Sequence, residues 1–191
     1  MVVGHSLGGT VAARVAGCTE LRERIVGVAM VDITECAGLG SLARMEAMIG
    51  KRPRSFPSES AAIAWATNSG MILNPVSASI SVPAMLTGPT ANPDEGWTWK
   101  TDLLATRPFW AGWFEGMDGA FLSAGPSEAR RLLILNDLAS MGKELTVAQM
   151  QGQIQVLPMQ CAGHHIQEED PVSVADKLVG LLVTALPKRN V

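Results

Sequence analysis

The sequence predicts an α/β fold built around a parallel sheet, and three observations support this prediction. Short apolar segments rich in valine, isoleucine and leucine recur along the chain, as in strands buried on both faces of a sheet. Segments with a helical spacing of small or apolar residues alternate with them. The chain has 191 residues, 47% of them hydrophobic, and is long enough to bury the core of one domain.

The expected order of elements is strand, helix, strand, long insert, strand, helix, strand, helix. Residues 1–3 ("MVV") have the composition of the end of a buried strand, and the small residues at 8–16 suit a helix packed closely on a sheet. Residues 25–32 ("IVGVAMVD") form a second, nearly continuous apolar run. Further strands are predicted at residues 132–135 ("LLIL") and 153–157 ("QIQVL").

The last helix has the clearest signals in the chain. Asp170 can cap its first turn, and Pro171 suits the first helical position because proline has no N–H to leave unpaired. Its apolar residues recur on one face, which predicts packing against the sheet. These residues are Val174, Leu178, Leu181 and Leu182.

A long insert separates the second predicted strand from the third. We expect residues 1–37 and 128–191 to form the core and residues 38–127, hereafter the insert, to form a helical cap. Residues 58–69 are predicted to be a helix that ends at Gly70. The insert carries methionine, tryptophan and phenylalanine at helical spacings and holds all five tryptophans. Most of these aromatic rings are expected to fill its own core, and one or two to line a substrate groove.

Composition excludes several classes of partner. The formal net charge is −3 and no basic stripe is present, so we expect no nucleic acid partner. No apolar run approaches the roughly 18 residues of a membrane span, so no membrane partner is expected. The three cysteines (Cys18, Cys36 and Cys161) are far apart, which favours reduced thiols over a disulfide framework or a zinc site. We therefore expect an intracellular protein of the cytoplasm and also the nucleus, with no metal and no cofactor.

The segment "GHSLG" at residues 4–8 has the G-x-S-x-G pattern of a nucleophile, with a strand before it and a helix after it. Gly4 and Gly8 are expected to make room for the sharp turn, so that the Ser6 hydroxyl is exposed at the end of the strand. The Leu7 N–H would then face a developing oxyanion. The alternative is a glycine-rich turn without chemistry.

A serine nucleophile needs a neighbouring base, and in this architecture the acid and then the histidine follow it in the chain. His5 lies inside the serine motif and is expected to point elsewhere. The base must therefore come from the loop between the last strand and the last helix. We favour His164, directly after Gly163, and expect His165 to be a solvent-exposed neighbour.

Two aspartates are candidates for the acid, because each follows the end of a predicted strand. Asp32 closes the second strand and Asp137 follows the third. General fold logic slightly favours the later strand, yet either residue could be a helix cap. The residues by themselves leave this choice open.

Several segments together resemble one family, the protein phosphatase methylesterases, which are α/β hydrolases that demethylate protein phosphatase 2A. The nucleophile segment "VVGHSLGGTVA", the strand end "GVAMVDITE" and the loop "CAGHHIQEEDP" are similar to that family. The more specific matches are Arg52-Pro53 with the Phe56 that follows, the cluster "FWAGWF" and the segment "AQMQG". The resemblance spans nearly the whole chain.

The resemblance implies an α/β-hydrolase fold, of which this chain holds the last four strands of the parallel sheet with a helical cap between two of them. It implies Ser6 as nucleophile, His164 as base and Asp32, rather than Asp137, as acid. The implied substrate is the methyl ester on the carboxyl-terminal leucine of the phosphatase 2A catalytic subunit. The implied partners are the tail of that subunit and its holoenzyme.

The resemblance also implies a surface that faces the phosphatase. We expect it to include residues of the aromatic segment and of "AQMQG". The candidates are Trp110, Trp113, Phe114, Met150 and Gln151.

One departure from the family concerns the region before residue 1. The family has first strands and a glycine-containing oxyanion loop ahead of the nucleophile, so the expectation is a truncated and impaired enzyme. Two alternatives are a general small-ester hydrolase and a non-catalytic fragment that binds the phosphatase.

Overall fold

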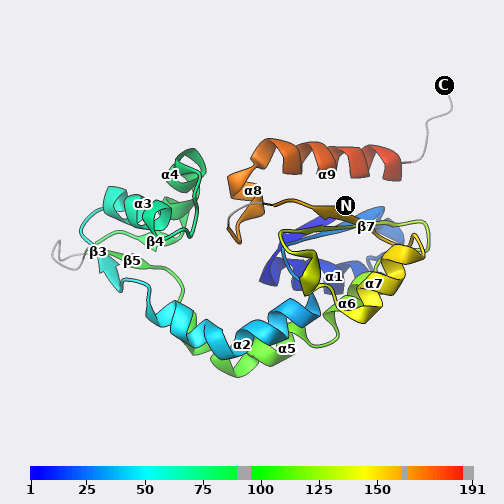
Figure 1. Ribbon diagram of the computed structural model, residues 1–191, viewed down its shortest axis with the longest axis horizontal. Coiled ribbons are helices and arrows are strands. Elements are labelled where there is room, and N and C mark those ends of the chain that lie inside the picture. The colour runs from blue at the N-terminus through cyan, green and yellow to red at the C-terminus, as the bar shows by residue number, and fades with distance from the viewer. Residues whose placement is uncertain (90–95, 161–162, 187–191) are drawn as a thin grey trace.

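The computed structural model describes residues 1–89, 96–160 and 163–186 of the chain (Figure 1). Its main sheet has four parallel strands, and the predicted α/β fold is confirmed. All four predicted strands are present, displaced by a few residues from the predicted ends. In spatial order they are β1 (Val2–His5), β2 (Gly27–Val31), β6 (Arg130–Leu135) and β7 (Gln155–Pro158).

The carboxyl ends of these strands are level with one another, which brings the residues after them together. His5 pairs with Val31, and Val31 pairs with Ile134. The ladder continues one residue further, because Ser6 donates its N–H to the Val31 carbonyl at 2.9 Å and Asp32 donates to the Ile134 carbonyl at 2.8 Å. The backbone therefore holds Ser6 and Asp32 at the same edge of the sheet.

Both faces of the sheet are covered by helices, so side chains from one strand enter two separate cores. In β2, Val28 and Met30 enter a core built with small alanines of the first helix, while Ala29 and Val31 enter a core under the last helix. This alternation follows from the two-residue period of a strand. The first face carries α1 (Leu7–Gly17), α6 (Met117–Leu122) and α7 (Lys143–Met150); the second carries α8 (Ile166–Glu169) and α9 (Pro171–Ala185).

The last helix, α9, forms as the sequence indicates. The Asp170 carboxylate accepts the Ser173 N–H at 3.1 Å and so caps the first turn. Val174 and Leu181 are buried against the sheet, and Leu178 packs beside them. The predicted cap is confirmed, and so is the apolar face for these three of its four predicted residues.

The insert lies between β2 and β6 and contains helices and, unexpectedly, a small antiparallel sheet. Trp97 and Trp99 lie in its central strand, where the sequence suggested helix. Ser58 caps the predicted helix by accepting the Ala61 N–H. The helices are α2 (Glu35–Gly50), α3 (Glu59–Asn68), α4 (Pro75–Ala84) and α5 (Trp110–Phe114); the strands are β3 (Ser55–Phe56), β4 (Leu86–Thr87) and β5 (Trp97–Trp99).

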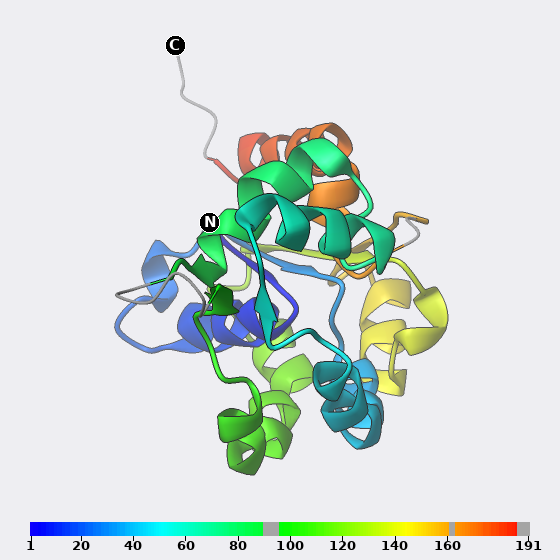
Figure 2. The same ribbon diagram turned by 90° about the vertical axis from the view of Figure 1, so that its left-hand side faces the viewer.

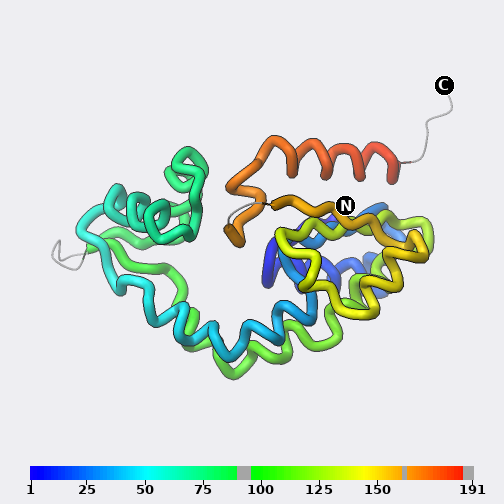
Figure 3. Tube along the Cα trace, in the orientation of Figure 1, coloured from blue at the N-terminus to red at the C-terminus, as the bar shows by residue number. Residues whose placement is uncertain are grey.

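The distal part of the insert is placed over the carboxyl edge of the main sheet. Helices α2 and α5 run side by side and lead to the small sheet (Figure 3). Viewed from that side, α3 and α4 lie in front of the main sheet (Figure 2). This part has its own core, formed by Phe56, Ala62, Ala66, Ile72, Ala78, Val82 and Leu86.

Two further sequence expectations concern membranes and thiols. Over the described parts of the chain, none of the helices has the length and apolarity needed to span a bilayer. Cys18 and Cys36 are exposed free thiols, whereas Cys161 lies outside the described residues.

Candidate active site

Three side chains meet at the carboxyl edge of the sheet and form one series of hydrogen bonds. The Nε2 atom of His164 lies 2.9 Å from the Ser6 hydroxyl oxygen. The Nδ1 atom of the same ring lies 2.7 Å from a carboxylate oxygen of Asp32. With Nδ1 protonated, the ring donates to Asp32 and offers Nε2 as an acceptor for the serine proton. The arrangement can therefore activate the serine hydroxyl.

The turn that carries Ser6 is tight and strained. Ser6 has a φ of 51°, a conformation that non-glycine residues seldom adopt. A side chain at Gly4 would place its Cβ 1.9 Å from the Gly8 carbonyl oxygen, and one at Gly9 would lie 2.6 Å from Ile33. A Cβ at Gly8 would meet nothing within 4 Å. Gly4 therefore has the predicted steric role, but Gly9, not Gly8, is the second required glycine.

Leu7 begins helix α1 immediately after the serine. Its N–H is one of the first-turn donors that have no partner inside a helix, and no acceptor for it is found within the described residues. A donor in this place can stabilise negative charge on an oxygen bound next to Ser6.

The two candidate acids have different surroundings in the structure. Asp32 also has a φ of 51°, and its second carboxylate oxygen accepts the Asn136 N–H at 3.1 Å. Burial opposes its ionisation, but the hydrogen bonds from His164 and Asn136 outweigh burial and hold the pKa of Asp32 below its usual value. The Asp137 carboxylate instead accepts the Ala139 N–H at 2.9 Å and caps a short helical turn.

The rings of the other two histidines lie close to that of His164. Nε2 of His5 lies 2.8 Å from the carbonyl oxygen of His164, so His5 must donate there, and the two rings are 4.7 Å apart. Burial lowers the pKa of His5 to about 4, which keeps the ring neutral at neutral pH. His165 is half-buried, and its Nδ1 is buried without a partner among the described residues. The prediction that His165 is exposed is therefore wrong, whereas His5, as predicted, is not directed at Ser6, although its ring packs against that of His164.

Two glutamates after the histidine loop connect that loop to the insert. The Glu169 carboxylate accepts the N–H groups of Leu73 and Asn74 at 2.7 and 3.0 Å. The Glu168 carboxylate accepts the Ser81 hydroxyl at 2.9 Å. The Glu169 carboxylate thus satisfies two N–H groups at the start of α4, and the Glu168 carboxylate accepts a hydroxyl further along that helix. Together the two side chains fix α8 to α4.

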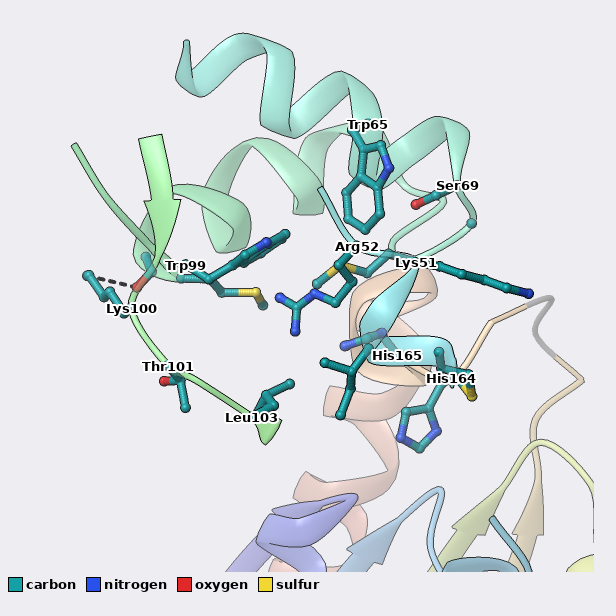
Figure 4. Close-up of a pocket in the computed structure, with 16 residues that line it drawn as sticks. Lys51, Arg52, Trp65, Ser69, Trp99, Lys100, Thr101, Leu103, His164 and His165 are labelled. Atoms are coloured by element: carbon teal, nitrogen blue, oxygen red, sulfur yellow. Dashed lines mark hydrogen bonds between the residues drawn. The ribbon is translucent and has the colours of Figure 1, made fainter. Parts of the chain in front are cut away.

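A cavity of about 870 Å³ opens between the histidine loop and the insert (Figure 4). His164 and His165 line one part of it, and Trp65 and Trp99 line another. From the sequence, one or two aromatic rings of the insert are expected to line a groove, and the structure shows that Trp65 and Trp99 line this cavity. The remaining wall is mostly aliphatic or sulfur-containing, with three cationic side chains.

The five predicted partner-binding residues divide into two groups. Trp110 and Phe114 are buried in the protein core, and Trp113 packs partly buried against the same core. These side chains hold α5 in place, so the prediction that they face a partner is wrong for Trp110 and Phe114. Met150, which is 84% exposed, and Gln151 lie on the surface at the end of α7.

Comparison with protein families identifies the fold and its relatives. Residues 1–177 match the model of the alpha/beta hydrolase family. Protein phosphatase methylesterase 1 of Yarrowia lipolytica is 38% identical over 94% of this chain and 42% of its own length. A probable protein phosphatase methylesterase 1 of Caenorhabditis elegans is 32% identical over 93% of this chain and 47% of its own length. The family resemblance seen in the sequence is confirmed, and the chain spans less than half the length of these relatives.

Solved structures agree on the fold. The crystal structure of E-2-(acetamidomethylene)succinate hydrolase matches 95% of this chain and 66% of its own chain with a TM-score of 0.73 and 17% identity. A Mycobacterium tuberculosis esterase matches with a TM-score of 0.62 and 18% identity over 95% of this chain and 61% of its own. At such low identity these likenesses establish the fold alone.

Proposed function

The chain belongs to the alpha/beta hydrolase family, and on this premise we propose that it carries the catalytic residues of a serine esterase that demethylates a protein phosphatase. The observation that carries the proposal is the hydrogen-bonded series from Ser6 through His164 to Asp32. The names of the methylesterase relatives support the choice of ester.

In the proposed first step, Ser6 attacks the ester carbonyl while His164 accepts its proton at Nε2. Asp32 is held ionised by its hydrogen bonds and stabilises the imidazolium that forms. The Leu7 N–H donates to the developing oxyanion. His164 then returns the proton to the leaving oxygen, and methanol departs.

In the second step, water attacks the acyl enzyme along the same route. His164 accepts a proton from the water and returns it to the Ser6 oxygen as the acyl group leaves. The products are the free carboxylate and the original enzyme. Every proton transfer in both steps passes through one ring nitrogen, Nε2, which already lies 2.9 Å from the serine oxygen.

The substrate we propose is the methyl ester on the carboxyl-terminal leucine of the protein phosphatase 2A catalytic subunit. The aromatic and aliphatic wall of the cavity beside His164 suits a leucine side chain. We further propose that Met150 and Gln151 contact the body of the phosphatase or its holoenzyme, because an exposed methionine is an adaptable apolar contact.

The test is to incubate the chain with the methylated catalytic subunit and measure released methanol, beside a full-length methylesterase relative. We expect release that disappears in Ser6→Ala. Rapid turnover of a p-nitrophenyl ester without turnover of the methylated phosphatase would instead indicate a general small-ester hydrolase. Binding of the phosphatase without release would indicate a non-catalytic binding module.

A further inference from the structure

We propose that Arg52 binds an anionic group, a carboxylate or a phosphate, on the peptide that carries the ester. The site is the cavity between the histidine loop and the insert. This inference rests on the proposed function and extends it, because it specifies the chemistry of the substrate beyond the ester group.

The first observation is that Arg52 has unused hydrogen-bonding capacity. Its guanidinium lies over the Trp99 ring, 3.7 Å from the ring centre, and faces the cavity (Figure 4). Its Nε is buried and has no hydrogen-bond partner among the described residues. Buried polar atoms are nearly always paired in folded proteins, so an orphaned donor beside a cavity points to a missing acceptor.

The second observation is the charge of the cavity wall. Lys51, Arg52 and Lys100 line it, and no aspartate or glutamate is among the lining residues in the described part of the chain, although the whole chain has a formal net charge of −3. Lys100 uses one of its three donors on the Ala84 carbonyl at 2.8 Å. Positive charge concentrated on a partly apolar wall favours an anion in the cavity.

A second arginine of the insert shows the contrast. Arg107 lies on the surface and forms an ion pair with Glu46 at 3.0 Å. Arg52 has no such partner in the described chain, and burial lowers its pKa. Arg52 is partly buried, and an unpaired cation that is partly removed from water is costly, so an anionic ligand would offset that cost.

The third observation is that the same cavity reaches one of the catalytic residues. His164 lines it together with Arg52, so one ligand can reach both. A peptide with its ester beside Ser6 would lay apolar groups on Trp65 and Trp99 and extend an acidic side chain to Arg52. The guanidinium fork can grip a carboxylate or a phosphate with two parallel hydrogen bonds, and it already lies against a ring that holds its orientation.

The experiment measures peptide binding, which does not depend on catalysis. The 191-residue chain is titrated with apolar peptides that end in an uncleavable amide and differ only by glutamate, phosphoserine or glutamine at one position near that end. Fluorescence of the cavity tryptophans reports binding. We expect the glutamate or phosphoserine peptide to bind on the order of tenfold tighter than the glutamine peptide, with the preference reduced by salt. The relative affinity of the two anionic peptides tells which oxyanion is preferred.

Two variants test the residue itself. Arg52→Gln should remove the preference, while Arg52→Lys should keep part of it because the charge remains. Arg54→Gln makes the same change at an exposed arginine that does not line the cavity, and it should leave the preference unchanged. Near-UV circular dichroism checks that each variant is folded.

Equal affinity of the wild-type chain for all three peptides would overturn the proposal, as would a preference that survives Arg52→Gln. The wild-type comparison needs no variant, so a folding defect cannot obscure it. Fluorophosphonate labelling of Ser6 in the same samples tests the proposed function separately. Labelling without a peptide preference contradicts only the role of Arg52, and a preference without labelling contradicts only the esterase proposal.

Discussion

The catalytic edge of the sheet and the cavity of the insert differ in whether their polar side-chain atoms have hydrogen-bond partners. At the edge, both ring nitrogens of His164 and both carboxylate oxygens of Asp32 have partners. In the cavity, the Arg52 Nε has none within the described chain. The edge is assembled in advance, as catalysis requires, because preorganised groups need no rearrangement during the reaction. In the cavity, an unpaired hydrogen-bond donor is left that a ligand can use.

The difference has a structural origin. Ser6 and Asp32 extend a ladder of strand hydrogen bonds, and each is held at a positive φ of 51° that only a rigid surrounding can maintain. Arg52 follows the end of helix α2, in a part of the insert that has its own small core. A residue outside a ladder and at a helix end is fixed by fewer contacts.

The largest expected effect would come from removing the nucleophile at the preassembled edge. Ser6→Ala should lower esterase turnover by on the order of 10⁶, and His164→Ala should lose nearly as much, because these residues act as a unit. Fluorophosphonate labelling followed by mass spectrometry measures this. Ser79→Ala, an exposed helix serine, is the control and should label normally. Labelling that persists in Ser6→Ala would place the nucleophile elsewhere.

The next effect concerns the acid. Asp32→Asn should lower turnover by about 10⁴, because an amide no longer fixes the histidine tautomer. Asp137→Asn should leave turnover unchanged and stability within a few tenths of a kcal/mol, since asparagine caps as well as aspartate. Steady-state kinetics of the two variants show which aspartate supports His164. An inactive Asp137→Asn beside a normal Asp32→Asn would reverse the assignment.

A smaller effect is expected from His5, and it tests whether the position of His164 depends on the hydrogen bond between these two residues. His5 donates from Nε2 to the His164 carbonyl, so His5→Leu should lower kcat about five- to tenfold with little change in KM. His5→Gln retains an N–H donor and should recover most of kcat. Equal losses in the two variants would mean that ring packing, and not this hydrogen bond, positions His164.

The smallest effect lies at the junction of the two regions, where Asp118 of α6 meets the start of α2. Asp118 is 4% exposed and accepts the Glu35 N–H at 2.9 Å. Burial, together with the charges of Glu35 and Glu144, raises its pKa from 3.8 to about 6. The folded state therefore holds this proton more tightly than the unfolded state, and the stability contributed by the protonated group is lost as pH rises through about 6.

Asp118→Asn cannot lose a proton and should be more stable than the wild type at pH 7, by about 1–2 kcal/mol after allowance for solvent screening. The two proteins should converge in stability near pH 4. Urea unfolding at several pH values measures this, with the exposed Asp176→Asn as control. A constant difference across that range would show that proton binding at Asp118 is not the cause.

Local patterns in the sequence determined much of the fold and part of the site. The four strands were visible as apolar runs, and α9 was visible from Asp170 and its apolar face, because burial and capping depend on residues close together in the chain. The serine turn was visible for the same reason, since its glycines lie next to Ser6. The small antiparallel sheet was missed because strands of two or three residues are too short to show a period.

Only the tertiary structure decided which groups meet. Asp32 and Asp137 both follow strands, and the sequence does not tell them apart; the folded loop brings His164 to Asp32, 132 positions away in the chain. The contact of His5 with His164 and the stacking of Arg52 on Trp99 also join residues that lie far apart in the chain. Such contacts depend on how separate elements pack against one another. The spacing of apolar residues within one helix or strand indicates only which of its faces is buried. The turn at Ser6 is thus determined by neighbouring residues in the chain, whereas the residues that interact with the Ser6 side chain are determined by the tertiary fold.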